Sequence, residues 1–129
     1  MIGVLLDTNA LIWVLAGDPR LGGRARAQVA EAPRVHFSAV SVLEITLKEM
    51  LGRLRVPGDI VGAGADAGLI ELPFNAQHGV GLSSFPSLAR RDPFDRMLLS
   101  QAQHEGLRLL TSNARLLEVD LGFLLDART

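Results

Sequence analysis

The chain alternates short apolar runs with longer stretches that have the spacing of amphipathic helices. Five short runs are typical of strands buried on both faces of a sheet: residues 2–6, 35–37, 69–72, 107–111 and 122–125. The stretches between them predict helices over residues 8–15, 22–32, 40–54, 59–68, 75–83 and 93–106. This order predicts an α/β fold in which helices cover both faces of a central, mainly parallel sheet of four or five strands.

Local signals define several of the expected ends. Thr8 is expected to cap the first helix, and Gly17-Asp18-Pro19 is expected to end it. Residues 85–91 predict an irregular loop, and Asn113 is expected to cap a short helix after the fourth strand. No repeat or linker divides the chain, so residues 1–129 are expected to form one domain.

The longest helical pattern, residues 40–54, is amphipathic. At about 100° per residue, six apolar side chains fall on one arc: Val40, Leu43, Leu47, Met50, Leu51 and Leu54. Glu44 lies at the edge of this arc, next to Lys48.

Asp95 is the polar residue that the helical patterns explain least. On a helix that starts near residue 93, it falls on the same apolar face as Phe94, Leu98, Leu99 and Ala102. An isolated buried carboxylate is too costly to keep charged, so it must be protonated, hydrogen-bonded or bound to a metal ion.

Other polar residues follow directly on predicted strands. They are Asp7, Ser38 and the turn Thr111-Ser112-Asn113. In a parallel sheet, ligands bind at the carboxyl ends of the strands, at a topological switch point. These residues are therefore expected at one edge of the sheet.

Each acidic residue also has a purely structural explanation. Asp7 fits a helix cap or a turn, and Glu44 fits an exposed ion pair with Lys48 four residues later. Asp92 fits an N-cap, to which Asp95 could reach back as in a capping box. The capping box explains Asp92 better than Asp95, because glutamate or glutamine is the usual partner and this helix face is apolar.

Taken together, Asp7, Glu44 and Asp95 predict a cation site. Clustered carboxylates repel one another unless a cation lies between them. Their oxygen ligands suit Mg²⁺ or Mn²⁺, as one ion or two, and no cysteine or histidine is placed to favour zinc. Such ions can activate water and stabilise an in-line displacement at phosphorus, so the acids predict a phosphodiester hydrolase.

The composition of the chain says less about its function than these acidic residues do. The chain has no cysteine, which excludes disulfides, thiolate metal sites and cysteine nucleophiles. Its net charge of −1 gives no general attraction to nucleic acid. Twelve arginines against one lysine favour bidentate phosphate contacts, although biased genomic composition also explains that ratio. The apolar N-terminus lacks a basic start and is split by Asp7, so we expect no signal peptide, no membrane span and a cytoplasmic protein.

Three segments carry a resemblance that covers nearly the whole chain: LLDTNALIWVLAGDPRL, SAVSVLEITLKEMLGRL and RRDPFDRMLLSQAQHEGLRLLTSNARL. In this order the motifs make the chain resemble the PIN-domain nucleases, and among them the VapC-type ribonuclease toxins of bacterial type II toxin–antitoxin systems. The resemblance implies a PIN-like three-layer α/β/α sandwich and an endoribonuclease that depends on Mg²⁺ or Mn²⁺. It also implies a homodimer, an RNA substrate and a cognate antitoxin that inserts a segment near the active site.

The resemblance assigns roles to individual residues. Asp7, Glu44 and Asp95 would be the catalytic, metal-binding acids, with Asp92 as a cap or outer helper. Further polar residues would orient ligands or water: Thr8, Asn9, Ser38, Ser41 and Thr111. The positions before the DPFDR motif, where relatives often have histidine, hold two candidates for RNA phosphate contacts, Arg90 and Arg91.

Asn113 departs from the family pattern, since relatives usually have an aspartate there. Its carbonyl oxygen can still bind metal or water, but it supplies no charge and should weaken the binding of a second cation. This departure leaves open an alternative, a catalytically weakened PIN-fold module that acts through a protein partner. A phosphoryl receiver is disfavoured, because the single lysine of the chain lies on an early helix.

Overall fold

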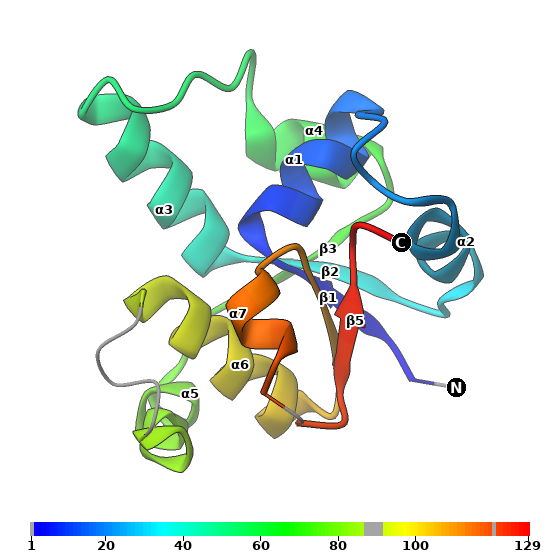
Figure 1. The fold of residues 1–129 in the computed structure, drawn as a ribbon. Helices are drawn as coiled ribbons and strands as arrows, with labels where there is room; N and C mark the ends of the chain where they lie inside the picture. Colours follow the sequence, from blue (N-terminus) through cyan, green and yellow to red (C-terminus); the bar gives the residue numbers. More distant parts are fainter. Residues whose placement is uncertain (1, 87–91, 120) are drawn as a thin grey trace.

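The computed structural model describes residues 2–86, 92–119 and 121–129. Five parallel strands form one sheet in the order β3-β2-β1-β4-β5 (Figure 1). The strands are β1 (Val4–Leu6), β2 (Val35–Ser38), β3 (Ile70–Leu72), β4 (Arg108–Thr111) and β5 (Leu124–Asp126). The helices are α1 (Thr8–Ala16), α2 (Gly23–Glu31), α3 (Ala39–Met50), α4 (Ile60–Asp66), α5 (Ala76–Gly81), the 3₁₀ turn η1 (Leu82–Ser84), α6 (Pro93–Glu105) and α7 (Ala114–Leu117).

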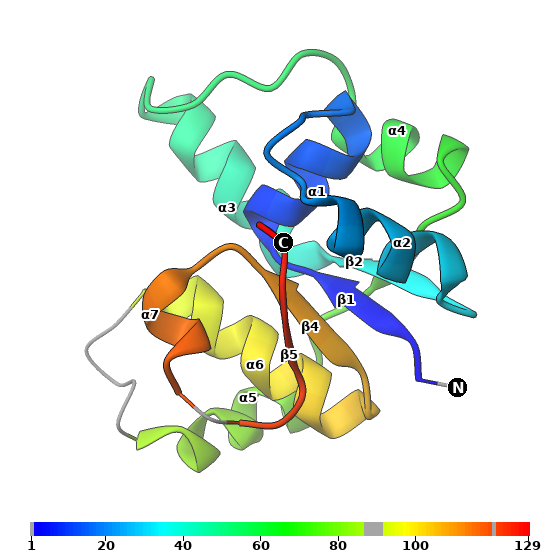
Figure 2. The same ribbon diagram turned by 45° about the vertical axis from the view of Figure 1, so that its right-hand side comes forward.

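The sheet is buried on both faces. Val4 and Leu6 of β1 pack in one core with α1 and α2, whereas Leu5 packs in the other core with α6 and α7. Leu109 and Leu110 of β4 divide between the two cores in the same way. Figure 2 shows α1 and α2 on one side of the sheet and α5 and α6 on the other. The predicted three-layer α/β/α sandwich is therefore confirmed.

The direction of sheet building reverses between β1 and β4. From β1 the chain adds β2 and then β3 on one side, and it later returns to place β4 on the other side of β1. The carboxyl ends of β1 and β4 therefore form the topological switch point of the sheet, the usual ligand site of open parallel sheets. Asp7 directly follows β1, and Thr111 ends β4.

Asp7 caps α1, so the prediction that Thr8 would do so is wrong. Asp7 has an extended backbone, and its Oδ1 accepts a hydrogen bond from Ala10 N at 2.7 Å. Because the aspartate takes the cap one residue earlier, the Thr8 hydroxyl is left to contact α3. Asn113 caps α7 as predicted.

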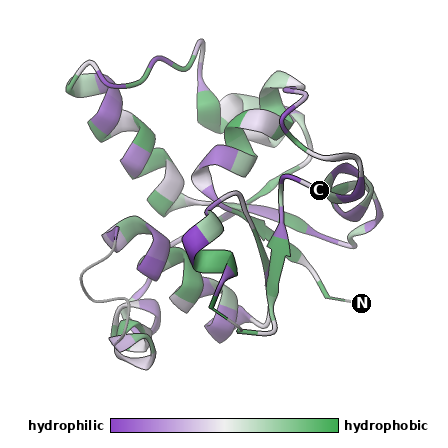
Figure 3. Ribbon diagram, in the orientation of Figure 1, coloured by the Kyte–Doolittle hydropathy of each residue, from purple (hydrophilic) through white to green (hydrophobic). Residues whose placement is uncertain are grey.

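α3 is shorter than predicted, and its apolar arc faces outward. It ends at Met50 rather than at residue 54, and its buried residues are Val40, Ser41, Glu44 and Ile45. Four of the six side chains in the predicted arc are exposed: Leu43, Leu47, Met50 and Leu51. The exposed fraction reaches 65% for Leu51 and 78% for Met50. Figure 3 shows hydrophobic and hydrophilic residues alternating along this helix. Periodicity reveals an apolar face, but it does not say whether the chain's own core or another molecule covers that face.

The remaining elements differ from the predictions mainly at their ends. α4 is shorter than the predicted helix at residues 59–68, and the predicted helix at 75–83 divides into α5 and η1. Most of the predicted loop at 85–91 lies outside the described residues. No helix in the described part of the chain is long and apolar enough to cross a membrane.

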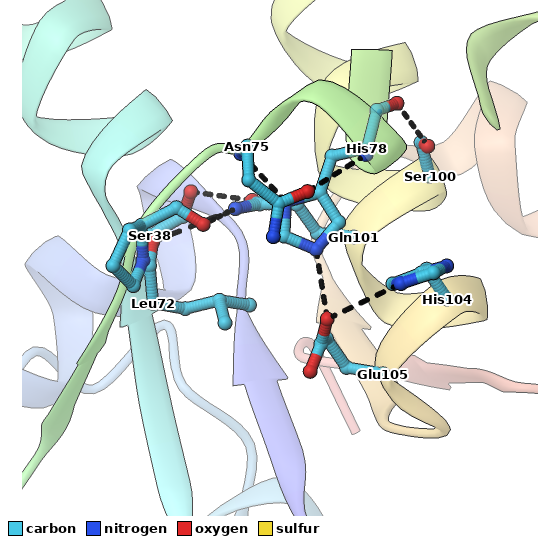
Figure 4. A network of polar contacts seen from close by, with 9 residues as sticks. Ser38, Leu72, Asn75, His78, Ser100, Gln101, His104 and Glu105 are labelled. Carbon is cyan, nitrogen blue, oxygen red and sulfur yellow. Dashed lines mark hydrogen bonds and ion pairs between the residues drawn. The ribbon is translucent and has the colours of Figure 1, made fainter. Parts of the chain in front are cut away.

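Buried polar side chains fasten α6 to the sheet (Figure 4). Gln101 is fully buried, and its Oε1 accepts a hydrogen bond from the Ser38 hydroxyl at the end of β2. Its Nε2 donates to the carbonyl groups of Leu72 and Pro73, where β3 ends. These bonds join α6, which carries Asp95 in its first turn, to the carboxyl ends of two strands.

We expect Gln101→Leu to lower the free energy of unfolding by about 1–3 kcal/mol, because the Leu72 and Pro73 carbonyls and the Ser38 hydroxyl lose their buried partner. Gln103→Leu is the control, since Gln103 is exposed on the same helix, and it should change the value by less than about 0.5 kcal/mol. Urea denaturation measures both. Equal effects of the two substitutions would contradict a contribution from this network.

Candidate active site

A polar pocket of about 220 Å³ opens beside the carboxyl ends of β1 and β4. In Figure 1 the helices that supply its walls, α1, α3 and α6, surround this edge of the sheet together with the β4–α7 turn. Nine residues line the pocket: Asp7, Thr8, Asn9, Glu44, Lys48, Asp92, Asp95, Ser112 and Asn113. The pocket therefore lies at the switch point, as the polar residues after the strands predicted.

Asp7 is 5% exposed and has donors on both of its carboxylate oxygens. Its Oδ1 receives the Ala10 N–H of α1, and its Oδ2 receives the Ser112 N–H of the β4–α7 turn at 3.1 Å. Burial raises the pKa of Asp7, whereas these two bonds and a hydrogen bond from Thr111 oppose the rise. The carboxylate of Asp7 thus both caps α1 and lines the pocket.

Glu44 is held from two sides within a nearly buried position, 6% exposed. The Thr8 hydroxyl donates to its Oε1 at 2.6 Å and also lies 3.0 Å from the Ser41 hydroxyl. Lys48 Nζ lies 2.5 Å from its Oε2, so the ion pair suggested by the i,i+4 spacing exists. We expected this ion pair to be exposed to solvent, but Glu44 is nearly buried and faces the pocket.

Asp95 faces the pocket from the first turn of α6. Its Oδ2 accepts a hydrogen bond from Asn113 Nδ2 at 2.8 Å. Burial raises the pKa of Asp95 to about 6, with smaller increases from Asp92, Asp7 and Glu44, and the bond from Asn113 opposes this rise. Asp95 is therefore partly buried and hydrogen-bonded, as its position on an apolar helix face predicted.

Asp92 caps α6, as predicted. Its side chain accepts a hydrogen bond from Phe94 N at 2.9 Å, and Pro93 occupies the first turn of the helix. Asp92 also lines the pocket, so it adds a fourth carboxylate to the three that the acidic cluster predicted.

The charge balance of the pocket suits a divalent cation. Four carboxylates face it, those of Asp7, Glu44, Asp92 and Asp95, against the single ammonium group of Lys48. All four are hard oxygen donors, which are the ligands that Mg²⁺ and Mn²⁺ prefer. The raised pKa values of Asp7 and Asp95 show that burial makes their negative charge costly without a cation. No three of these acids have carboxylate oxygens that all lie within 4.8 Å of one another.

A second group of candidate ligands lies at the other end of α6. His78, His104 and Glu105 form the one group of three such residues, within the described part of the chain, whose ligand atoms lie within 4.8 Å of one another (Figure 4). His78 Nδ1 accepts the Asn75 N–H at 3.0 Å, so the proton of the neutral ring is on Nε2, 2.9 Å from Glu105 Oε2. Coordination through Nε2 would require the ring proton to move to Nδ1, where it would face the Asn75 N–H donor, so these hydrogen bonds give His78 a structural role.

Most of the predicted lining residues reach the pocket, but one does not. Thr8 and Asn9 line it directly, while Ser41 and Thr111 contact residues that line it. Ser38 is an exception, because its hydroxyl donates to Gln101 and caps α3 instead. Two further predicted residues, Arg90 and Arg91, lie outside the described residues, and their phosphate contacts stay a prediction.

Two lining residues were given no role in the predicted site, although Ser112 was expected at this edge of the sheet. Ser112 donates its backbone N–H to Asp7, and its hydroxyl accepts a bond from Asn9 Nδ2 at 3.2 Å. Lys48 was considered only as an exposed partner of Glu44. The available signal was that Lys48 lies one helical turn after an acid already assigned to the pocket.

The orientation of Asn113 corrects the prediction that its carbonyl oxygen would serve metal or water. Its Oδ1 accepts the N–H groups of Arg115 and Leu116 as the cap of α7. Because only an oxygen can accept these two bonds, Nδ2 must be the atom that faces Asp95. Asn113 therefore presents a hydrogen-bond donor, not an acceptor, to the acids.

The profile of the PIN-domain family matches residues 4–121, a span that contains every wall of the pocket. The chain belongs to the PIN-domain family. PIN domains are nucleases that typically use divalent metal ions, so the pocket has the donor set that the family's chemistry needs. No curated protein matches this chain.

Solved structures of toxin–antitoxin proteins share the fold of this PIN domain. VapBC-1 from nontypeable Haemophilus influenzae has a TM-score of 0.69 at 18% identity, over 99% of this chain and 100% of that chain. DNA-bound VapBC from Salmonella typhimurium has a TM-score of 0.67 at 23% identity, over 98% of both chains. VapC20 from Mycobacterium tuberculosis, a sarcin-ricin loop cleaving toxin, has a TM-score of 0.65 at 19% identity, over 98% and 99%.

We expect Asp95→Asn to stabilise the metal-free PIN domain at neutral pH. Since the pKa of Asp95 is about 6 in the folded chain and near 3.8 when unfolded, the wild type loses stability as pH rises from about 4 to 6. Asparagine removes this loss and can still accept the bond from Asn113. Thermal unfolding in EDTA should show a gain on the order of 1 kcal/mol at pH 7.5, after solvent screening, and almost none at pH 4. A gain at pH 4 that shrinks toward pH 7.5 would contradict the assignment.

Proposed function

We propose that this PIN domain is a metal-dependent endoribonuclease, the toxin of a type II toxin–antitoxin pair. The observation that supports it most is the pocket at the switch point, which is lined by acids from the start of α1, from α3 and from α6 and by a single ammonium group, that of Lys48. We further propose that residues 1–129 form a single nuclease domain that works in the cytoplasm.

Asp7, Glu44 and Asp95 would hold the cation, with Asp92 beside them. A bound Mg²⁺ or Mn²⁺ lowers the pKa of a water ligand and stabilises negative charge at a phosphodiester. The protein fixes the acids beforehand: Ala10 and Ser112 hold Asp7, and the Thr8 hydroxyl holds Glu44. Such outer hydrogen bonds orient ligands and keep their basicity.

RNA is the proposed substrate. The similar structure from Mycobacterium tuberculosis is that of a sarcin-ricin loop cleaving toxin, which supports RNA cleavage for this chain as well. Arg90 and Arg91 directly precede Asp92 in the sequence and are the proposed phosphate contacts, since arginine binds phosphate in a bidentate manner.

We propose two protein partners, a cognate antitoxin and a second copy of the chain. The similar VapBC structures are complexes that support an antitoxin. The exposed apolar face of α3 supports a homodimer, because one helix face can pair with itself about a two-fold axis. Its exposed members recur at helical spacing: Leu43, Leu47, Met50 and Leu51.

A weakened PIN module that acts only through a partner is the second candidate. It is favoured by one observation, that Asn113 and Lys48 already satisfy two of the pocket's acids. The two candidates differ in whether the purified chain cleaves RNA.

Purified wild type should cleave total RNA with Mg²⁺ or Mn²⁺ and lose this activity in EDTA. We expect Asp7→Asn to lower the rate by at least about 100-fold, since even loss of an outer partner of a metal ligand costs 10- to 100-fold. Asp66→Asn, an exposed acid of α4, is the control and should cleave normally. Gel analysis of RNA fragments against time measures each rate.

Activity that survives EDTA or Asp7→Asn would overturn the metal-dependent mechanism. Absence of cleavage by the wild type, together with cleavage by Asn113→Asp, would favour the weakened module.

Met50→Glu should dissociate the homodimer. Burying the new carboxylate at a self-paired apolar face is costly, so the dimer dissociation constant should rise by about tenfold or more. Val80→Glu is the control, because Val80 is 70% exposed on α5 in the opposite layer. Light scattering after size-exclusion chromatography measures the mass. A wild type that is monomeric, or a Met50→Glu variant that stays dimeric, would contradict the proposed interface.

A further inference from the structure

The pocket contains two groups that already neutralise its acids. Both come from this chain, and both contact a carboxylate that the proposed function assigns to metal binding. One is the ammonium group of Lys48, and the other is the amide group of Asn113.

Lys48 is a permanent positive charge at the wall of the pocket. Its Nζ pairs with Glu44 Oε2, while the other oxygen of Glu44 is occupied by the Thr8 hydroxyl. Asp92 and Asp95 also act on Lys48 electrostatically. The hydrogen bond to Glu44 raises the pKa of Lys48 above that of an ordinary lysine, so the group stays charged at any pH at which the enzyme would work.

Asn113 satisfies a second acid, Asp95, with a hydrogen bond instead of a positive charge. Its orientation is fixed, because its oxygen caps α7 through Arg115 and Leu116, so its N–H donor must face Asp95 Oδ2. An aspartate here would place a carboxylate oxygen where that donor now lies. The pair of oxygens would then repel each other and favour a cation between them.

We propose that Lys48 and Asn113 take the place of a second divalent cation, so that the pocket binds one ion. This inference rests on the proposed function. Lys48 supplies one fixed positive charge beside Glu44, and Asn113 satisfies Asp95 without charge. The remaining negative charge, centred on Asp7 and its neighbours, attracts a single divalent ion.

This arrangement has a consequence that a purely structural lysine would not have. If Lys48 merely tethers Glu44, its removal loosens a ligand and weakens metal binding. If Lys48 replaces a cation, its removal strengthens metal binding, because repulsion between the ammonium group and the ion is lost. The expected gain is about tenfold, on the order of the repulsion between a unit charge and a divalent ion across a solvated pocket.

The test is Mn²⁺ binding by the full chain, followed by calorimetry and by the electron paramagnetic resonance signal of free Mn²⁺. Wild type should bind one ion. Lys48→Met should bind one ion about tenfold more tightly, and Lys48→Arg, which keeps the charge, should match the wild type. Arg53→Met removes a positive charge from an exposed position just beyond α3 and controls for net charge; its affinity should match the wild type. The double variant Lys48→Met/Asn113→Asp should bind two ions.

Each contrary result has a distinct meaning. Two ions in the wild type, or weaker or unchanged binding by Lys48→Met, would overturn this inference while the proposed nuclease function stands. A folded double variant that binds only one ion would also overturn this inference. If circular dichroism shows that the double variant is unfolded, the Mn²⁺ affinity of Lys48→Met alone tests the inference. No Mn²⁺ binding by the wild type at millimolar concentration would overturn both the inference and the proposed function.

Discussion

The architecture of the site depends on how the buried carboxylate of Asp7 is satisfied. A carboxylate at 5% exposure is tolerated only if donors surround it, and these donors come from two elements distant in sequence, the first turn of α1 and the turn after β4. Asp7 therefore fixes the start of α1 and links the ends of the two strands that form the switch point. The same requirement places a negative charge at the base of the pocket, which every other acid of the site must then accommodate.

α3 separates two different surfaces, and this division explains its unusual composition. Its inner face carries Ser41, Glu44 and Ile45, which contact α1 or fill the core. Its outer face carries exposed leucines and Met50. The polar side of this helix thus faces the pocket, and the apolar side is the surface that we propose for the homodimer. A helix of this kind reverses the usual relation between hydrophobicity and burial.

The parts of the structure that follow from short-range chemistry were predictable from the sequence. Apolar runs and helical spacing gave the five strands and the layers, and the Asp92-Pro93 pair gave the start of α6. The end of the first strand located Asp7, and the acids on two predicted helices, Glu44 and Asp95, line the same pocket. The outward arc of α3 was not predictable, because periodicity carries no information about what covers a face. Ser38 was misplaced for a related reason: its partner, Gln101, lies on a helix whose packing the sequence alone does not reveal.

Asn113 shows how one uncharged amide group affects both the stability of the fold and the charge of the pocket. Where an aspartate would repel Asp95, the amide group donates a hydrogen bond to it, which stabilises the folded state. The same N–H donor offsets part of the charge on Asp95 Oδ2. The ammonium group of Lys48 does so more strongly at Glu44, because it carries a full positive charge. Asn113 and Lys48 thus reduce the net negative charge that the acids present to the pocket.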